Sequence, residues 1–303
     1  MHHLISTLVT VLAFIGPLGY SAFDEPKSQP KSAPVLWTFD ALQERLNAPS
    51  LRLLDARPRA NYEKSHIPGA VWVDAKAVEK LATRSVGHED KDAWEAWIGP
   101  LGITPQTDVV IYDANRQLDA ARLWWLLSYL GVEKVGLIDG NFPLWQRQGR
   151  PVATEIVRVN PKPFGVTFRK DKHATRSEVL EALKAKSAQI IDARSASEYT
   201  GTELRSKRGG HIPSACSLEW ANLVDQDGRF LDETALRAKL ELSGVKPGEP
   251  VITHCQGGGR ASVDAFVMER LGFSTRNYYL GWSDWGNTEE TPVETAKPKG
   301  EKP

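Results

Sequence analysis

The sequence contains two copies of one pattern, and this repeat restricts the fold more than any other feature. Asp55-Ala56-Arg57 returns as Asp192-Ala193-Arg194, and His66-Ile67-Pro68 returns as His211-Ile212-Pro213 with eight more residues between the two landmarks. Other landmarks return at one constant offset of 141 residues: Val110-Ile111 as Val251-Ile252, Gly131 as Gly272, Gly140 as Gly281, and Pro151-Val152 as Pro292-Val293. Each copy spans roughly 110 residues, a normal domain size, so we expect two similar domains in tandem and not a solenoid.

Within each copy, apolar runs alternate with helical patterns. The runs at 51–55, 109–112, 189–192 and 251–253 suit buried strands. The helical patterns at 118–130 and 260–271 each end before a glycine that suits a helix C-terminus. Strands that alternate with helices predict an α/β fold with a mostly parallel sheet and helices on both faces. In such sheets the functional site lies at the carboxyl ends of the strands.

The two ends of the chain differ from its middle. Residues 1–22 combine an apolar run with Gly16-Pro17 and small residues, as a secretory signal peptide does, although no Lys or Arg precedes the run. The run is shorter than the roughly 20 residues of a spanning helix, so we expect a periplasmic or secreted protein, with an uncleaved membrane anchor as the alternative. The expected organisation is a signal peptide at 1–22, linkers at 23–44 and 154–176, domains at 45–153 and 177–295, and a disordered tail at 296–303.

Composition and charge exclude several classes of protein. The 38 basic and 38 acidic residues give a net charge of zero, so no global field attracts nucleic acid or an anionic membrane. The two cysteines cannot by themselves build a four-cysteine zinc site or hold an iron–sulfur cluster. No His/Cys/Asp/Glu cluster has convincing metal-ligand spacing. We therefore expect neither cofactor nor metal, no nucleic-acid partner and a monomer.

One loop carries the residues best suited to chemistry. The predicted strand at 251–253 runs into His254-Cys255 and then Gln256-Gly257-Gly258-Gly259-Arg260, directly before a helix. Successive backbone N–H groups freed by the glycines can converge on one point, where the helix N-terminus and Arg260 add positive potential. This environment favours an anionic sulfur, so Cys255 is the predicted nucleophile.

The chain as a whole resembles the two-domain rhodanese-type sulfurtransferases, the thiosulfate/3-mercaptopyruvate sulfurtransferase family. The resemblance rests on the Asp-Ala-Arg and His-Ile-Pro of each half, the Cys255 loop and Gly281-Trp282-Ser283-Asp284-Trp285, and it covers about residues 45 to 295. It implies two rhodanese-like domains in tandem, each a mostly parallel five-stranded sheet flanked by helices. It also implies that Cys255 takes the sulfane sulfur of thiosulfate as a persulfide, releases sulfite and passes the sulfur to cyanide or a thiol.

The resemblance also implies further site residues. In relatives, the arginine that matches Arg194 lies close to the active thiol, and the region of the eight-residue insertion holds substrate-contacting arginines. Here the insertion contains Arg205, Lys207 and Arg208. With Cys255 as the catalytic residue, the predicted substrate-binding residues are Arg194, Arg205, Gln256, Gly257, Gly258, Gly259 and Arg260.

The first copy lacks this chemistry. The constant offset places Ala114 opposite Cys255, and the loop around it has neither a thiol nor a run of glycines. The resemblance implies an inactive first domain that helps to form the active-site cleft, and Arg116 and Arg122 are candidates to face that cleft. Trp124-Trp125 on the following helix are expected to pack in the core or between the domains.

Two histidines and the second cysteine are expected to have structural roles. His66 and His211 recur in both copies, one of which has no nucleophile, so both are interpreted as structural caps. Cys216 takes the place of Val71 and is interpreted as a small core residue. The alternative for Cys216 is a disulfide with Cys255 in an oxidising compartment.

Competing functions use the same loop. Cysteine-dependent phosphatases place five residues between the cysteine and the arginine, whereas Cys255 and Arg260 enclose four, which makes a tighter cradle for a single sulfur. The charge of Arg260 favours thiosulfate as the donor, with 3-mercaptopyruvate as the alternative. A further hypothesis is a sulfur-relay module that serves a thiol-bearing protein partner and turns over small donors slowly.

Overall fold

The computed structural model describes residues 33–84 and 87–295. The predicted signal peptide at 1–22 and the predicted tail at 296–303 lie outside these residues. Among the helices that the structure describes, none is both long and apolar enough to cross a membrane.

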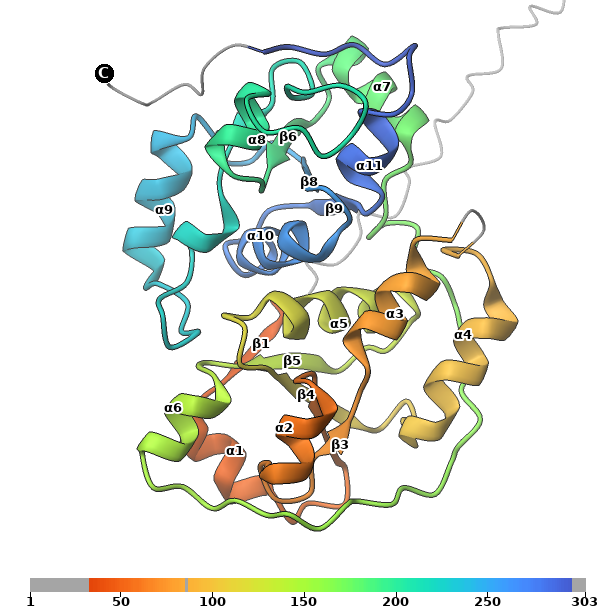
Figure 1. Cartoon of the computed structure of the whole chain (residues 1–303), viewed down its shortest axis with the longest axis vertical. Helices are drawn as coiled ribbons and strands as arrows, with labels where there is room; N and C mark the ends of the chain where they lie inside the picture. The colour runs from red at the N-terminus through yellow and green to blue at the C-terminus, as the bar shows by residue number, and fades with distance from the viewer. Residues whose placement is uncertain (1–32, 85–86, 296–303) are drawn as a thin grey trace, which may run out of the picture. The chain divides into compact units, whose positions relative to one another are not determined.

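The first half is built around a five-stranded parallel sheet with the strand order β1-β5-β4-β2-β3 (Figure 1). Its strands are β1 (Val35–Trp37), β2 (Leu51–Asp55), β3 (Val71–Trp72), β4 (Asp108–Tyr112) and β5 (Val135–Ile138). Its helices are α1 (Phe39–Arg45), α2 (Arg59–Lys64), α3 (Ala75–Ala82), α4 (Lys91–Ile98), the 3₁₀ helix η1 (Gly99–Leu101), α5 (Leu118–Tyr129) and α6 (Phe142–Arg147).

The first domain begins earlier in the chain than the predicted boundary at residue 45. Residues 35–44, assigned to a linker, form β1 and most of α1, and β1 pairs with β5 at the edge of the sheet. A strand of three residues is too short to show a period in the sequence. Helix α1 does have a local start signal, because the Thr38 hydroxyl accepts a hydrogen bond from the Ala41 N–H.

The second half repeats this architecture with a smaller sheet. Its parallel strands, in the order β7-β6-β8-β9, are β6 (Gln189–Asp192), β7 (Cys216–Ser217), β8 (Val251–His254) and β9 (Thr275–Tyr278). Its helices are α7 (Arg176–Ala185), α8 (Ala196–Thr200), η2 (Trp220–Asn222), α9 (Glu233–Leu242), α10 (Gly259–Arg270) and α11 (Gly281–Trp285).

The expectation of five strands in each sheet therefore needs a correction for the second half. Within the described residues that sheet has four strands, and one parallel bridge between His173 and Asn277 stands at the edge beyond β9. This is the edge that β1 occupies in the first half, where it pairs with β5. The fifth strand is thus reduced to a single bridge, because the chain turns into α7 directly afterwards.

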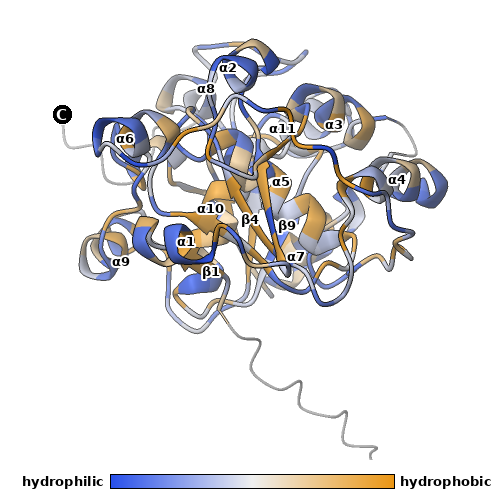
Figure 2. Cartoon of the chain, turned by 90° about the horizontal axis from the view of Figure 1, so that it is seen from below, coloured by the Kyte–Doolittle hydropathy of each residue, from blue (hydrophilic) through white to orange (hydrophobic). Residues whose placement is uncertain are grey.

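Apolar side chains cover both faces of each sheet, as expected for parallel strands. One face of the first sheet packs against α3, α4 and α5, and the other face packs against α1, α2 and α6. In the second half, α7, α8 and α11 cover one face, and α9 and α10 cover the other. Figure 2 shows the apolar residues gathered around the strands and around α5 and α10.

The two halves contact each other through equivalent helices, α5 and α10, which follow the equivalent loops (Figure 1). The ring of Trp124 on α5 meets Phe266 on α10 edge to face, with 4.9 Å between ring centroids. Trp125 stacks on Tyr279 of the second half at 5.0 Å. The prediction that both tryptophans pack in the core or between the domains is confirmed, since both are buried in one cluster with residues of the second half.

Replacing Trp124 by alanine tests whether this contact holds the halves together. Trp124→Ala removes a fully buried indole, so the free energy of unfolding should fall by about 3–5 kcal/mol in a denaturant titration. The control is Trp97→Ala, which removes a partly buried indole of α4 that packs edge to face on Trp94 and should cost clearly less. A loss in Trp124→Ala no larger than in the control would contradict this description of the interface.

Candidate active site

Cys255 follows the carboxyl end of β8, as predicted, and only 2% of its surface is exposed. Its carbonyl accepts a hydrogen bond from the Trp282 N–H at 2.7 Å, and the Gln256 carbonyl accepts one from Ser283 at 3.0 Å. Gly281 makes this approach possible, because its φ is +52° and a Cβ there would lie 2.1 Å from the Cys255 carbonyl oxygen. The N-terminus of α11 therefore binds the loop's carbonyl groups.

The N–H groups of the same loop are left open. Among the residues that the structure describes, no acceptor is bound by the backbone N–H groups of Gln256, Gly257, Gly258, Arg260 and Ala261. Gly258 has a φ of +81° and stands directly before α10, so the loop turns into the helix with these donors unused. Unpaired N–H groups at a helix N-terminus form a binding place for an anion.

The equivalent loop of the first half shows what such a loop binds. There the carboxylate of Asp113 accepts backbone hydrogen bonds at 3.0–3.1 Å from four N–H groups, those of Asn115, Gln117, Asp119 and Ala120. Gln117, at the position of Gly258, has a φ of +72°, so both loops share this backbone turn. Burial raises the pKa of Asp113 to about 6, although the N–H donors act in the opposite direction.

The comparison of the two loops explains why only one of them suits sulfur chemistry. The first domain fills its cradle of N–H groups with its own carboxylate, whereas the second domain leaves the matching groups without a protein acceptor. His254 stands at the position of Asp113, and it does not fill the cradle. Its imidazole is buried on the side of Asp192, 3.5 Å from that carboxylate, and burial lowers the pKa of His254 to about 4.

The sulfur of Cys255 lies in an apolar corner. Cys255 clusters with Ala193 and Ala261, and the partly buried Trp220 of η2 packs against this cluster. The sequence reasoning did not identify Trp220, because a 3₁₀ helix of three residues has no period that could single it out. Gln256 fixes the mouth of the loop, since its side-chain amide donates to the Arg205 carbonyl at 3.1 Å and the Ser206 hydroxyl at 3.2 Å.

Arg260 lies in the first turn of α10, as predicted, but its charge is paired. Its guanidinium donates two hydrogen bonds to Glu198, at 2.5 and 2.9 Å. Burial alone would raise the pKa of Glu198, but the hydrogen bonds and charge of Arg260 lower it to about 2. Arg205, whose side chain is half exposed, lies 3.5 Å from the same carboxylate. Sequence reasoning missed Glu198, because an ion pair between residues 198 and 260 leaves no local pattern.

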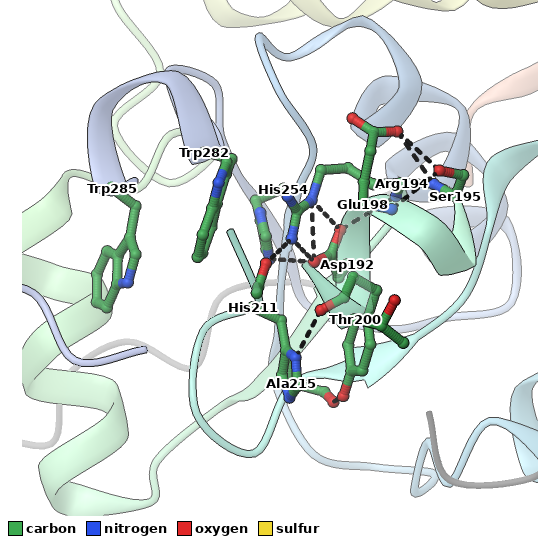
Figure 3. A network of polar contacts seen from close by, with 12 residues as sticks. Asp192, Arg194, Ser195, Glu198, Thr200, His211, Ala215, His254, Trp282 and Trp285 are labelled. Carbon is green, nitrogen blue, oxygen red and sulfur yellow. Dashed lines mark hydrogen bonds and ion pairs between the residues drawn. The ribbon is translucent and has the colours of Figure 1, made fainter. Parts of the chain in front are cut away.

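Arg194 lies at the end of β6 and is paired with an acid. It is buried, it donates to both carboxylate oxygens of Asp192 at 2.6–3.1 Å, and it donates to the Gly210 carbonyl at 2.7 Å (Figure 3). Its guanidinium carbon lies 4.4 Å from the centroid of the Trp282 ring. These contacts give Arg194 a structural role at the end of β6, and its contact with the donor stays a prediction.

The first domain contains the same arrangement without a thiol. Arg57 binds Asp55 and the Ser65 carbonyl, and its guanidinium lies over the Phe142 ring. The matching histidines also correspond, since His66 binds the Tyr62 carbonyl at 2.8 Å and His211 binds the Tyr199 carbonyl at 2.9 Å. The structural roles predicted for both histidines are therefore confirmed.

Arg122 is the residue of the first domain that reaches the Cys255 loop, as expected. Its Nη1 donates to the Gly257 carbonyl and to the Tyr279 hydroxyl, each at 3.3 Å, and pairs with Glu79 at 2.8 Å. A Cβ on Gly259 would lie 2.4 Å from the Arg122 Nη2, so a larger residue there would displace the Arg122 guanidinium from the loop. Arg116 also contacts the second half, through the carbonyl groups of Ala221, Val224 and Asp225.

The remaining predictions concern the second thiol and metal binding. Cys216 and Cys255 do not form a disulfide with each other, and Cys216 packs beside the core on the α9 and α10 side of the sheet. This agrees with a core role for Cys216 and gives no support to the disulfide. Across residues 33–84 and 87–295, no group of three or more His, Cys, Asp or Glu is arranged to hold a metal ion.

A buried acid one helical turn after Arg260 was not anticipated. Asp264 is fully buried, and within the described chain neither carboxyl oxygen has a hydrogen-bond partner. Burial raises the pKa of Asp264 well above its ordinary value, and the charges of Cys255 and Asp192 raise it further. From sequence, an acid four residues after an arginine predicts an ion pair on a helix surface. The raised pKa favours the neutral form of Asp264, which carries no negative charge beside the thiol.

Comparisons with known proteins agree with this architecture. A family model described as the rhodanese-like domain matches residues 38–148 and 175–288. The chain is 33% identical over 255 residues to a thiosulfate sulfurtransferase of Azotobacter vinelandii, over 84% of this chain and 94% of that protein. It is 32% identical over 275 residues to a sulfur carrier protein of Thermus thermophilus, over 86% of this chain and 96% of that protein. The crystal structure of SseA from Escherichia coli, a 3-mercaptopyruvate sulfotransferase, matches with a TM-score of 0.73 at 27% identity, over 82% of this chain and 99% of that one.

The buried acid makes a prediction about stability and pH. An unfolded Asp titrates near pH 3.9, so above about pH 4 the folded state holds a proton that the unfolded state has released. Stability must therefore fall as pH rises through this window, by at most about 1.4 kcal/mol per pH unit. Asp264→Asn cannot titrate, so its stability relative to the unchanged protein should increase steadily from pH 4 towards neutrality in urea titrations.

The control for this series is Gln146→Asn, an exposed substitution on α6 that changes no titratable group. Its stability difference from the unchanged protein should stay nearly constant over the same pH range. A difference for Asp264→Asn that is equally constant would show that Asp264 is ionised in the folded protein.

Proposed function

Because this chain belongs to the rhodanese family, with one rhodanese-like domain in each half, we propose that it is a sulfurtransferase that takes sulfur from thiosulfate onto Cys255. The observation that carries the proposal is the contrast between the two loops. One cradle of N–H groups already holds the Asp113 carboxylate, and the matching groups over Cys255 are free for another anion. A persulfide is such an anion, and its negative charge sits on the outer sulfur.

The residues of the loop fit a two-step transfer. The Cys255 thiolate attacks the outer sulfur of thiosulfate, the sulfur–sulfur bond of thiosulfate breaks, and sulfite leaves with the electron pair. The free N–H groups between Gln256 and Ala261 then stabilise the charge on the persulfide. A nucleophile such as cyanide attacks the outer sulfur, thiocyanate leaves, and the thiolate is restored. Arg122 and the N-terminus of α11 hold the loop by its carbonyl groups, which keeps the N–H groups in place.

Two observations support thiosulfate as the donor. The chain matches a protein named thiosulfate sulfurtransferase over 94% of that protein's length. The half-exposed side chain of Arg205 adds positive charge beside the loop. The alternative donor is 3-mercaptopyruvate, because the fold also matches SseA, which is described as a 3-mercaptopyruvate sulfotransferase. The export prediction rests on residues 1–22 alone and is kept as part of the proposal, as are a monomeric state and a thiol-bearing protein as acceptor.

Intact-mass measurement tests the proposed intermediate. After incubation with thiosulfate and removal of excess donor, the protein should gain about 32 Da, the mass of one sulfur. Cys255→Ser should gain nothing, whereas Cys216→Ser, the matched control that removes the other thiol, should gain the same mass as the unchanged protein. The adduct should disappear when cyanide is added, and thiocyanate should form in equal amount.

Other outcomes would redirect the proposal. An adduct with 3-mercaptopyruvate but none with thiosulfate would overturn the choice of donor. An adduct that forms readily but turns over slowly with cyanide and rapidly with a partner thiol would indicate a sulfur relay. The absence of any adduct, together with hydrolysis of p-nitrophenyl phosphate that is lost in Cys255→Ser, would indicate a phosphatase.

A further inference from the structure

We propose that Glu198 determines which anionic donor this site prefers, because it cancels the charge of Arg260 beside Cys255. The inference rests on the proposed sulfur transfer and adds to it a residue that sets the charge of the donor. Glu198 lies on α8, which has no part in the Cys255 loop. Its role follows from the contacts that its carboxylate makes.

The carboxylate of Glu198 is placed to neutralise more than one cation. It binds Arg260 through two hydrogen bonds, at 2.5 and 2.9 Å, and lies 3.5 Å from the more exposed Arg205. Only 3% of the Glu198 side chain is exposed, against 16% for Arg260 and 49% for Arg205. Water screens a buried ion pair only weakly, so the negative charge of Glu198 offsets most of the positive charge of Arg260.

The other arginines near Cys255 have partners of their own. Arg194 is bound to Asp192, and Arg122 is bound to Glu79. Two further acids lie close enough to act on these charges. Burial raises the pKa of Asp264 and so favours its neutral form. Burial also raises the pKa of Glu219, which interacts with Arg260 through its charge but makes no hydrogen bond to it among the described contacts. Glu198 is therefore the acid that binds the arginine of the Cys255 loop directly, and its loss would add one positive charge there.

The two candidate donors differ in the negative charge that would interact with Arg260 and Glu198. Thiosulfate carries two negative charges at neutral pH, whereas 3-mercaptopyruvate carries one, on its carboxylate. An added positive charge stabilises a bound dianion about twice as strongly as a bound monoanion. The Glu198 carboxylate therefore limits the preference of the site for thiosulfate, and the site can still accept singly charged donors.

Glu198 also has a local role, which the test must separate from the electrostatic one. With Ser195 it forms the capping box of α8: the Ser195 hydroxyl accepts from the Glu198 N–H, and the Glu198 carboxylate accepts from the Ser195 N–H (Figure 3). Glutamine serves in a capping box as glutamate does. Glu198→Gln thus removes the charge and keeps the cap.

The experiment compares kcat/KM for thiosulfate and for 3-mercaptopyruvate with cyanide as the acceptor. In Glu198→Gln the ratio of thiosulfate to 3-mercaptopyruvate should rise about tenfold, the effect of one unit charge a few ångströms away at an intermediate dielectric. The rise should come mainly from KM for thiosulfate and should shrink as ionic strength increases. A general gain in the reactivity of the thiol would raise kcat/KM for both donors together and leave their ratio unchanged.

The matched control is Glu203→Gln, which removes the same charge from the same segment. Glu203 binds the Ser197 hydroxyl and makes no contact with Arg260 among the described contacts, so the ratio should stay within about twofold of the unchanged protein. The double variant Glu198→Gln/Arg260→Gln restores charge balance. Its ratio should return towards that of the unchanged protein, even if both rates are low.

Three results would contradict the proposed role of Glu198. An unchanged ratio in a folded Glu198→Gln variant overturns the role of Glu198, as does an equal rise in Glu203→Gln. A ratio that stays high in the double variant overturns the route through Arg260. Failure of the unchanged protein to turn over either donor would instead overturn the proposed function, so the two failures are distinguishable.

Discussion

The site depends on one physical feature, a set of backbone N–H groups that converge at the N-terminus of a helix. In both halves a buried parallel strand ends, the chain turns through a residue with positive φ, and a long helix begins. These N–H groups have no acceptor within the helix, so they need an anion or water. The first half supplies Asp113 from its own chain. The second half supplies none among the described residues, and Cys255 stands beside the open donors.

This difference gives each half a separate task. The first domain has a satisfied loop and serves as a support: Arg122 reaches from it to the Cys255 loop, and Arg116 reaches to carbonyl groups in and after η2. The second domain keeps unpaired donors, a buried thiol and closely balanced charges. Glu198 is paired with Arg260 and Asp192 with Arg194, and the unpaired N–H groups add positive potential beside Cys255.

Sequence reasoning could predict the features that local pattern determines. The repeat predicted two like domains, and an apolar run followed by Cys255 and glycines predicted a strand, a turn and a helix in the order observed. The features that it missed depend on contacts between distant residues. Arg194 looked available because its burial under Trp282 is a tertiary property, and the pairing of Arg260 with Glu198 joins residues 62 positions apart. β1 was missed since three residues show no period, and Asp264 gave the pattern of a surface ion pair although it lies in the interior.

The most direct test of this account is a crystal structure of the protein after treatment with thiosulfate, with its two halves superposed on α5 and α10. The account predicts an extra sulfur on Cys255 within hydrogen-bond distance of the N–H groups between Gln256 and Ala261. After superposition that sulfur should fall where the Asp113 carboxylate lies in the first half. A persulfide whose outer sulfur points away from these N–H groups, or a loop that rearranges so that protein acceptors fill the cradle, would contradict it.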